Sequence, residues 1–222
     1  MNTAQGPTLR QVLFSILIGT IAMGLTVGFM ELNKFSVNHE DEFRTSFEPV
    51  IFSLKQAALN KSPNYGRLSQ EALAELKEAP QWVLPSEFAL ISEGLKAYEL
   101  HQESVTLSEI ALVHLGKFQE KFRYLRIQGR SSFEMGELDA ARTAFASAVQ
   151  LVKDHPDFTF QMQEVNRLAV LIEWIHGELD QPQCDHAHDV YETIKDINGR
   201  ILNAFSTFVK RATTRYQSAC RM

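Results

Sequence analysis

The fold of this chain is decided by the stretch from Phe122 to Pro156, which reads FRYLRIQGRSSFEMGELDAARTAFASAVQLVKDHP. Apolar residues recur on both sides of Gly136 at three- and four-residue steps, a pattern that predicts two amphipathic helices joined by a tight turn. We expect Gly129 to let the second helix approach the first, and Gly136 to supply the left-handed residue where the first helix stops. Pro156 then ends the unit.

Small residues flank one aromatic residue in the second of these helices. Ala141 and Ala148 lie seven positions apart on one face, and Phe145 falls between them at the four-residue step. We therefore expect a bulky side chain held between two sites of close contact, as a tight helical hairpin requires.

This unit resembles a tetratricopeptide repeat (TPR). With Phe122 as position 1, the residues that match the small and large positions of that family's signature are Gly129, Gly136, Leu138, Ala141, Phe145, Ala148 and Leu151. The chain departs from the signature at Leu125, where tryptophan is commonest, at Ser132, where tyrosine is usual, and in a proline that arrives about three residues late. The resemblance implies an all-α fold, a right-handed array of antiparallel helical hairpins.

Composition excludes several classes of protein. The chain has 222 residues, of which 45% are hydrophobic and 22% charged, with a formal net charge of −5. This is enough for one domain and an anchor, and the acidic balance argues against a dedicated nucleic-acid binder, because neutralising phosphates requires a basic face. Gly-x-Ser-x-Gly, a glycine-rich phosphate loop and His-Glu-x-x-His do not occur, so we expect no enzyme, no catalytic residue and no cofactor.

Residues 11–30 carry no charge and are long enough to cross a bilayer, so they predict a single transmembrane anchor. A cleaved signal peptide is the alternative, but the run exceeds a usual signal core and no Ala-x-Ala-like site follows it. Thr20, Gly24 and Gly28 form a flat face for helix pairing, which makes a homodimer an option. Arg10 before the span and acidic residues after it favour an orientation with the helical domain outside the cytoplasm. We expect the membrane to be a bacterial inner membrane.

The remaining chain divides into segments by composition. We predict a tail at 1–10, the anchor at 11–30, an acidic neck at 31–46, a TPR-like helical domain at 47–217 and a tail at 218–222. Four hairpins are expected in the domain, at 47–79, 86–116, 118–153 and 158–217.

Several boundaries rest on local signals. Pro49 should lie in the first turn of its helix, the capping-box spacing of Thr106 to Glu109 should begin another, and Gly177 should close the helix that begins near Phe158. The last helix is expected to run unbroken from near Cys184 to about Gln217. Its apolar stripe is longer than one partner helix covers, so it either caps the array or meets a second chain.

The resemblance also places partner-binding residues. First helices line the concave face of such arrays, and the matching positions here are Arg123, Arg126, Arg130, Phe133 and Glu134. Lys121 extends the same basic surface. Because arginine pairs with carboxylates in a bidentate manner, we expect acidic peptide segments or membrane-complex subunits as partners. The alternative is that the arginines pair with Glu93, Glu99 or Glu164 of neighbouring helices.

Cysteine and histidine residues gather near Cys184. Cys184 and His188 share a helix face, with His176 as a third candidate ligand across the loop, but two or three such residues do not define a zinc site and we expect no metal. A Cys184–Cys220 disulfide would require the last helix to break, for which Gly199 is a suitable place. Whether Cys184 and Cys220 are bridged or free stays open.

After residue 199 the chain is basic and lacks acids, and its cations are Arg200, Lys210, Arg211, Arg215 and Arg221. This predicts either a solvated helix end or contact with acidic lipids or an acidic partner. The whole pattern favours a membrane-anchored scaffold or adaptor that binds proteins. The alternatives are a helical sensory or ligand-binding domain on a dimerising signal anchor, and, third, a metal-dependent enzyme at the cysteine-histidine cluster.

Overall fold

The computed structural model describes residues 39–181, 184–201 and 206–220, and every regular element within these ranges is helical. This confirms the all-α prediction for that part of the chain. The predicted anchor at 11–30, with Thr20, Gly24 and Gly28, lies outside the described residues. Within the described ranges no helix is both long and apolar enough to cross a membrane.

The chain divides into two compact units, Met1–Pro49 and Val50–Met222. Residues 39–59 are helical, so the helix includes part of the predicted neck. Phe43 and Phe47 extend the apolar stripe toward the N-terminus; both are buried and their rings stack 5.0 Å apart. The prediction that Pro49 lies in the first turn is therefore wrong, because the helix begins at least ten residues earlier.

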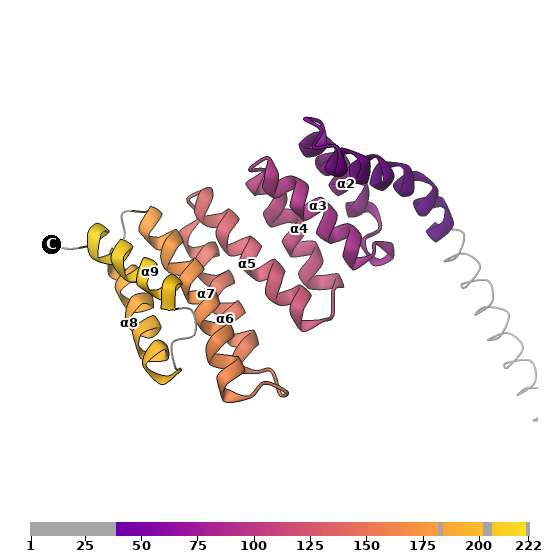
Figure 1. Ribbon diagram of the computed structural model, residues 1–222. Helices are drawn as coiled ribbons and strands as arrows, with labels where there is room; N and C mark the ends of the chain where they lie inside the picture. The colour runs from indigo at the N-terminus through magenta and orange to yellow at the C-terminus, as the bar shows by residue number, and fades with distance from the viewer. Residues whose placement is uncertain (1–38, 182–183, 202–205, 221–222) are drawn as a thin grey trace, which may run out of the picture. The chain divides into compact units, whose positions relative to one another are not determined.

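The second unit is an array of helices in antiparallel pairs (Figure 1). Each helix packs on the next, and the pairs α2 and α4, α5 and α7, and α7 and α9 also meet. The elements are α2 (Tyr65–Glu78), a short 3-10 helix η1 (Pro80–Trp82), α3 (Pro85–Ala97), α4 (His101–His114), α5 (Phe118–Glu134), α6 (Leu138–Lys153), α7 (Phe160–Asp180), α8 (Cys184–Arg200) and α9 (Ser206–Ala219).

The α5–α6 hairpin forms as its sequence predicts. Gly136 has a φ of 76°, in the left-handed region, at the turn between the two helices. Phe145 is fully buried, and a Cβ added to Gly129 would lie 2.7 Å from its ring. Ala141 and Ala148 on either side are fully buried as well. The small residues therefore bring α5 and α6 close enough for one aromatic ring to fill the space between them.

A second close approach joins α5 to α7. A Cβ on Gly177 would lie 2.3 Å from the Phe133 ring, and Trp174 stacks on Phe145 at 6.0 Å. Gly177 does not end its helix, as the sequence suggested, because α7 continues to Asp180. Because Gly177 has no side chain, the Phe133 ring of α5 can pack directly against the backbone of α7.

The predicted start of a helix at Thr106 is also wrong. Helix α4 already begins at His101, so the capping-box spacing falls in its interior. The Thr106 hydroxyl donates to the Gln102 carbonyl at 3.0 Å, and the Ser108 hydroxyl donates to the Ser104 carbonyl at 2.7 Å. A Thr or Ser hydroxyl can donate to the carbonyl four residues earlier within a helix, so the capping-box spacing does not mark a helix start here.

The prediction of one unbroken C-terminal helix is wrong, because the structure has two helices there. Helix α8 ends at Arg200, next to Gly199, and α9 begins at Ser206 and packs against both α7 and α8. Most of the predicted apolar stripe is buried by this return, because Ile194 and Ile197 of α8 share a core with Val209 and Ala212 of α9. Phe208 of α9 stays 52% exposed.

A disulfide closes the α8–α9 hairpin. Cys184 and Cys220 are bonded, with their Cα atoms 5.6 Å apart and a sequence separation of 36. Tyr216 stacks on Tyr191 at 4.3 Å, and its hydroxyl lies 2.7 Å from Nδ1 of His188. The sequence left this bridge open because an unbroken helix would have held the cysteines far apart.

One fully buried carboxylate ties α6 to α7. Glu178 accepts hydrogen bonds from Arg142 at 2.8 and 2.9 Å and from the Trp174 indole N–H at 2.9 Å. Burial opposes ionisation of Glu178, but the bonds from Arg142 and Trp174 outweigh it, so its pKa lies below the usual range. This contribution to stability is present at neutral pH and is lost as the pH falls through that lowered pKa.

Gly177 and Gly199 offer a matched test of the close approach. We expect G177A to lower the free energy of unfolding by about 1–3 kcal/mol, since the new methyl group must displace the Phe133 ring. G199A, also in a helix but with nothing within 4 Å of the added atom, should be neutral or raise it by up to about 1 kcal/mol. Urea unfolding followed by circular dichroism measures both. Equal effects would contradict the packing described.

The disulfide yields a second prediction. Replacing both cysteines, as C184S/C220S, should cost about 2–4 kcal/mol, because the open loop regains conformational freedom in the unfolded chain. Thermal unfolding with and without reductant measures this loss. Reductant should lower the Tm of the wild type and leave that of the variant unchanged; a wild type that melts identically in both conditions would argue against the bridge.

Candidate functional site

Helix α5 is buried on two sides and carries arginines on another. Phe122 and Phe133 lie on one buried side, and Tyr124 lies on the opposite one. Tyr124 is 2% exposed and meets Phe88 edge to face at 6.4 Å, and burial raises its pKa to about 12, so the phenol stays neutral. The third side carries Arg123, Arg126 and Arg130, which we call the arginine face.

Arg123 pairs across to α3. Its guanidinium donates to Glu93 at 2.8 Å, and the two side chains are 39% and 59% exposed. This is one of the pairings that the sequence offered as an alternative to partner binding. An exposed pair of this kind contributes little to stability and opens readily, so Arg123 stays accessible to a competing carboxylate.

Arg126 and Arg130 share one carboxylate, Glu173 of α7. Arg126 binds it in a bidentate manner, with Nε 3.0 Å from Oε2, and its guanidinium also lies 5.2 Å from the centre of the Phe122 ring. Arg130 is more loosely held, with Nε 3.7 Å from Glu173 and 45% of its side chain exposed. Two positive charges thus face one negative charge, which leaves an excess of positive potential at this point.

The other predicted site residues differ in their exposure to solvent. Phe133 is 3% exposed and packs in the core beside Phe145, so it positions α5 from within. Lys121 is partly buried, and no carboxylate pairs with it in the described part of the chain. Glu134 is exposed at the end of α5. The structure therefore brings the arginines and Glu134 to the surface and takes Phe133 away from it.

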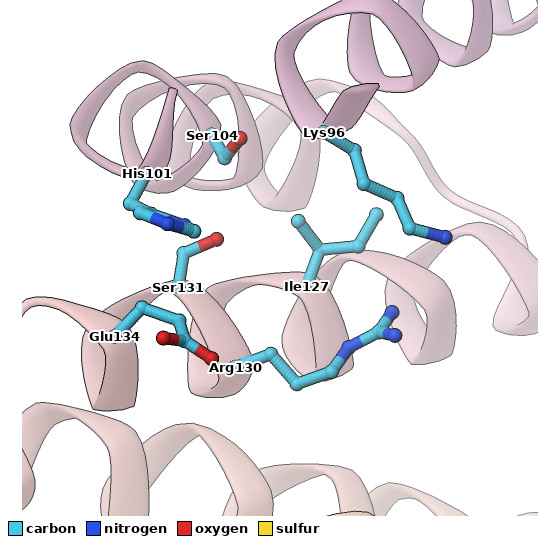
Figure 2. A pocket seen from close by; sticks show the side chains of 7 residues that line it. All are labelled: Lys96, His101, Ser104, Ile127, Arg130, Ser131 and Glu134. Atoms are coloured by element: carbon cyan, nitrogen blue, oxygen red, sulfur yellow. The ribbon is translucent and has the colours of Figure 1, made fainter. Parts of the chain in front are cut away.

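Glu134 and Arg130 border a small hollow of about 140 Å³ (Figure 2). Helices α3 and α4 supply the opposite wall, and the lining residues are Lys96, His101, Ser104, Ile127, Arg130, Ser131 and Glu134. The polar ends of Lys96 and Arg130 lie on the same side of Ile127 in this view. The space is well below that of a usual ligand pocket, so it suits a single side chain or an ion.

A larger hollow, of about 360 Å³, lies where α5, α7 and α9 meet. We call it the α5–α7–α9 hollow; its lining residues are Arg126, Ala169, Ile172, Glu173, His176, Phe208 and Arg211. Sequence reasoning missed it because α9 was not expected to turn back onto α7. The two cysteines were the available signal, since a bridge between them requires that return.

His176 in this hollow is held by α9. Arg215 donates to its Nδ1 at 3.0 Å and also pairs with Asp180. Burial lowers the pKa of His176, and the positive charge of Arg215 lowers it further, so the imidazole is mainly neutral at neutral pH. Charge in the hollow therefore comes from Arg126, Arg211 and Glu173.

The cysteine-histidine cluster has a structural role in the described chain. The sulfur of Cys184 is bonded to Cys220 and so is not a free thiolate, the form in which cysteine binds zinc. Across residues 39–181, 184–201 and 206–220, no group of three His, Cys, Asp or Glu side chains is arranged to hold a metal ion.

We expect the two arginines on Glu173 to differ in stability. R126A should lower the free energy of unfolding by about 1–2 kcal/mol, because it leaves a half-buried carboxylate without its bidentate partner. R130A should cost less than about 0.5 kcal/mol, as exposed ion pairs do. Urea unfolding at low salt compares them. A larger cost for R130A than for R126A would show that the pairing is misassigned.

Comparison of the chain with protein-family models, curated proteins and solved structures finds no match. The function proposed below therefore rests on the residues and their geometry.

Proposed function

We propose that this chain is a membrane-anchored scaffold or adaptor of TPR type, which binds protein partners on the arginine face and assists an assembly at the membrane. The observation that carries the proposal is the charge on α5. Arg123, Arg126 and Arg130 lie against only two carboxylates, Glu93 and Glu173, among the described residues. A surplus cation on a chain whose formal net charge is −5 is a local feature suited to an acidic partner.

The TPR assignment is supported by the α5–α6 hairpin. Its glycines lie where a turn and a close approach need them, and its small residues surround Phe145, as in the family's signature. The contact between α5 and α7 adds the stacking of one first helix on the next that a repeat array requires. An array of this kind offers a continuous face for an extended segment of a partner.

Membrane anchoring is supported by the uncharged stretch at 11–30. The Cys184–Cys220 bridge favours an oxidising compartment for the helical domain, because disulfides rarely persist in a reducing cytoplasm. This agrees with the orientation that the flanking charges predict. An anchor would also raise the effective concentration of the arginine face for partners in the same membrane.

The partner chemistry follows from the arginines. A peptide carboxylate can replace Glu93 at Arg123 or take up the free donors of Arg130, whose contact with Glu173 is long. Bidentate pairing with guanidinium gives such a segment a defined orientation. Partners with runs of Asp or Glu are therefore the best candidates.

A sensory or ligand-binding domain is the second candidate. The α5–α7–α9 hollow favours it, since about 360 Å³ lies at the lower end of volumes that hold small molecules. A small molecule that copurifies with the full-length chain and raises its Tm would support this alternative.

Photocrosslinking in the native membrane tests the scaffold function. A photoreactive amino acid at Glu134, beside the arginine face, should trap the same membrane proteins repeatedly, while one at exposed Ser147 of α6 should not. In the R123A/R130A background the yield should fall by at least about tenfold, because two charged contacts are lost. The matched control K77A/K153A removes the same charge elsewhere and should retain the wild-type yield.

This design leaves the Arg126–Glu173 pair intact, so loss of capture does not reflect unfolding of the array. Equal capture by the two double variants would mean that the arginine face is structural. Crosslinks confined to a second copy of the chain would favour the dimeric sensor instead.

A further inference from the structure

We propose that the α5–α7–α9 hollow is the specificity pocket of this surface, and that it receives a large apolar side chain of a partner peptide together with a neighbouring Asp or Glu. This inference rests on the proposed function and names the partner sequence that the surface selects. The occupant is a segment of a protein partner.

The wall of the hollow is apolar where two helices meet. Ala169 and Ile172 come from α7 and Phe208 comes from α9, where its side chain is 52% exposed. A half-exposed phenylalanine beside aliphatic side chains is a surface that gains stability when a further apolar group covers it. The volume of about 360 Å³ has room for one large side chain and an adjoining carboxylate.

The rim of the hollow is positively charged. Arg126 faces Glu173, which it shares with Arg130, and no carboxylate pairs with Arg211 among the described residues. The hollow is therefore lined by two guanidinium groups, Arg126 and Arg211, and by one carboxylate, Glu173. Arg211 is exposed and available, so it is the group that would bind the peptide carboxylate.

The hollow lies next to the arginine face, which favours an extended peptide as its occupant. Arg126 lines the hollow and also belongs to the arginine face, so an acidic segment bound along α5 continues into the hollow. Apolar contact at Phe208 and ion pairing at Arg211 then act on adjacent residues of one extended chain. Neither feature alone would select a sequence, whereas the combination requires an apolar residue next to an acidic one.

Selection from a displayed library of random peptides tests this inference. The bait is the full-length oxidised chain in lipid nanodiscs. We expect the enriched peptides to share a large apolar residue beside Asp or Glu. Failure to enrich any peptide, or enrichment of sequences without an acidic residue, would overturn the proposal.

The leading peptide, labelled with fluorescein, then serves as the probe for variants. R211A should weaken its binding by about tenfold or more, and F208A by a similar factor. The matched control K210A removes the neighbouring exposed cation, which does not line the hollow, and should bind like the wild type. Arg211 has no ion pair in the described chain, so R211A should keep the wild-type Tm even if F208A loosens the packing.

The outcomes separate this inference from the scaffold function. If R211A bound the peptide like the wild type while R123A/R130A lost capture, the hollow would be ruled out as a binding site and the arginine face would be retained. If both variants behaved like the wild type, both binding sites would be ruled out. A wild-type dimer that R211A and F208A convert to monomers would show that a second copy of the chain fills the hollow, and would overturn the proposal.

Discussion

Two aromatic rings packed against two glycines set the spacing of the central helices. Phe145 of α6 occupies the place of the side chain that Gly129 lacks, and Phe133 of α5 does the same at Gly177 of α7. Because each ring lies closer to the backbone than a Cβ would allow, α5, α6 and α7 have little freedom to slide or rotate. The central helices depend on these two contacts, because one holds α5 against α6 and the other holds α5 against α7.

The charged surface of α5 follows from its buried one. Once Phe133 and Gly129 face inward, the three- and four-residue steps of the helix carry Arg123, Arg126 and Arg130 outward together. Glu173 of α7 then meets two of the three, because α7 is held beside α5 by the Phe133 contact. The surface charge and the core packing are two sides of one helix, so a change that shifts α5 alters both.

The sequence predicted the α5–α6 hairpin well, but it misplaced the helix starts near Pro49 and Thr106 and missed the long-range returns. The α5–α6 hairpin was predictable, because the residues that Gly129, Gly136 and Phe145 contact or connect lie close to them in the sequence. Gly177 was misread as a helix end, since its reason is a ring on another helix, Phe133, about forty positions away. The sequence predicted that the arginine face would either bind a partner or pair with glutamates of neighbouring helices, but it did not identify Glu173 as one of those glutamates. The α5–α7–α9 hollow escaped notice because it exists only after α9 folds back.

Helix α9 covers apolar side chains of α7 and α8, is tied by Cys220 to the start of α8, and supplies Phe208 and Arg211 to the hollow. Repeat proteins commonly change length when a unit is duplicated or deleted. Here a helix pair inserted between α7 and α8 would move α9 away from α7 and Arg126, although the disulfide would keep α8 and α9 together. The hollow therefore requires that a single helix separate α7 from α9, and a helix pair added at that point would abolish it.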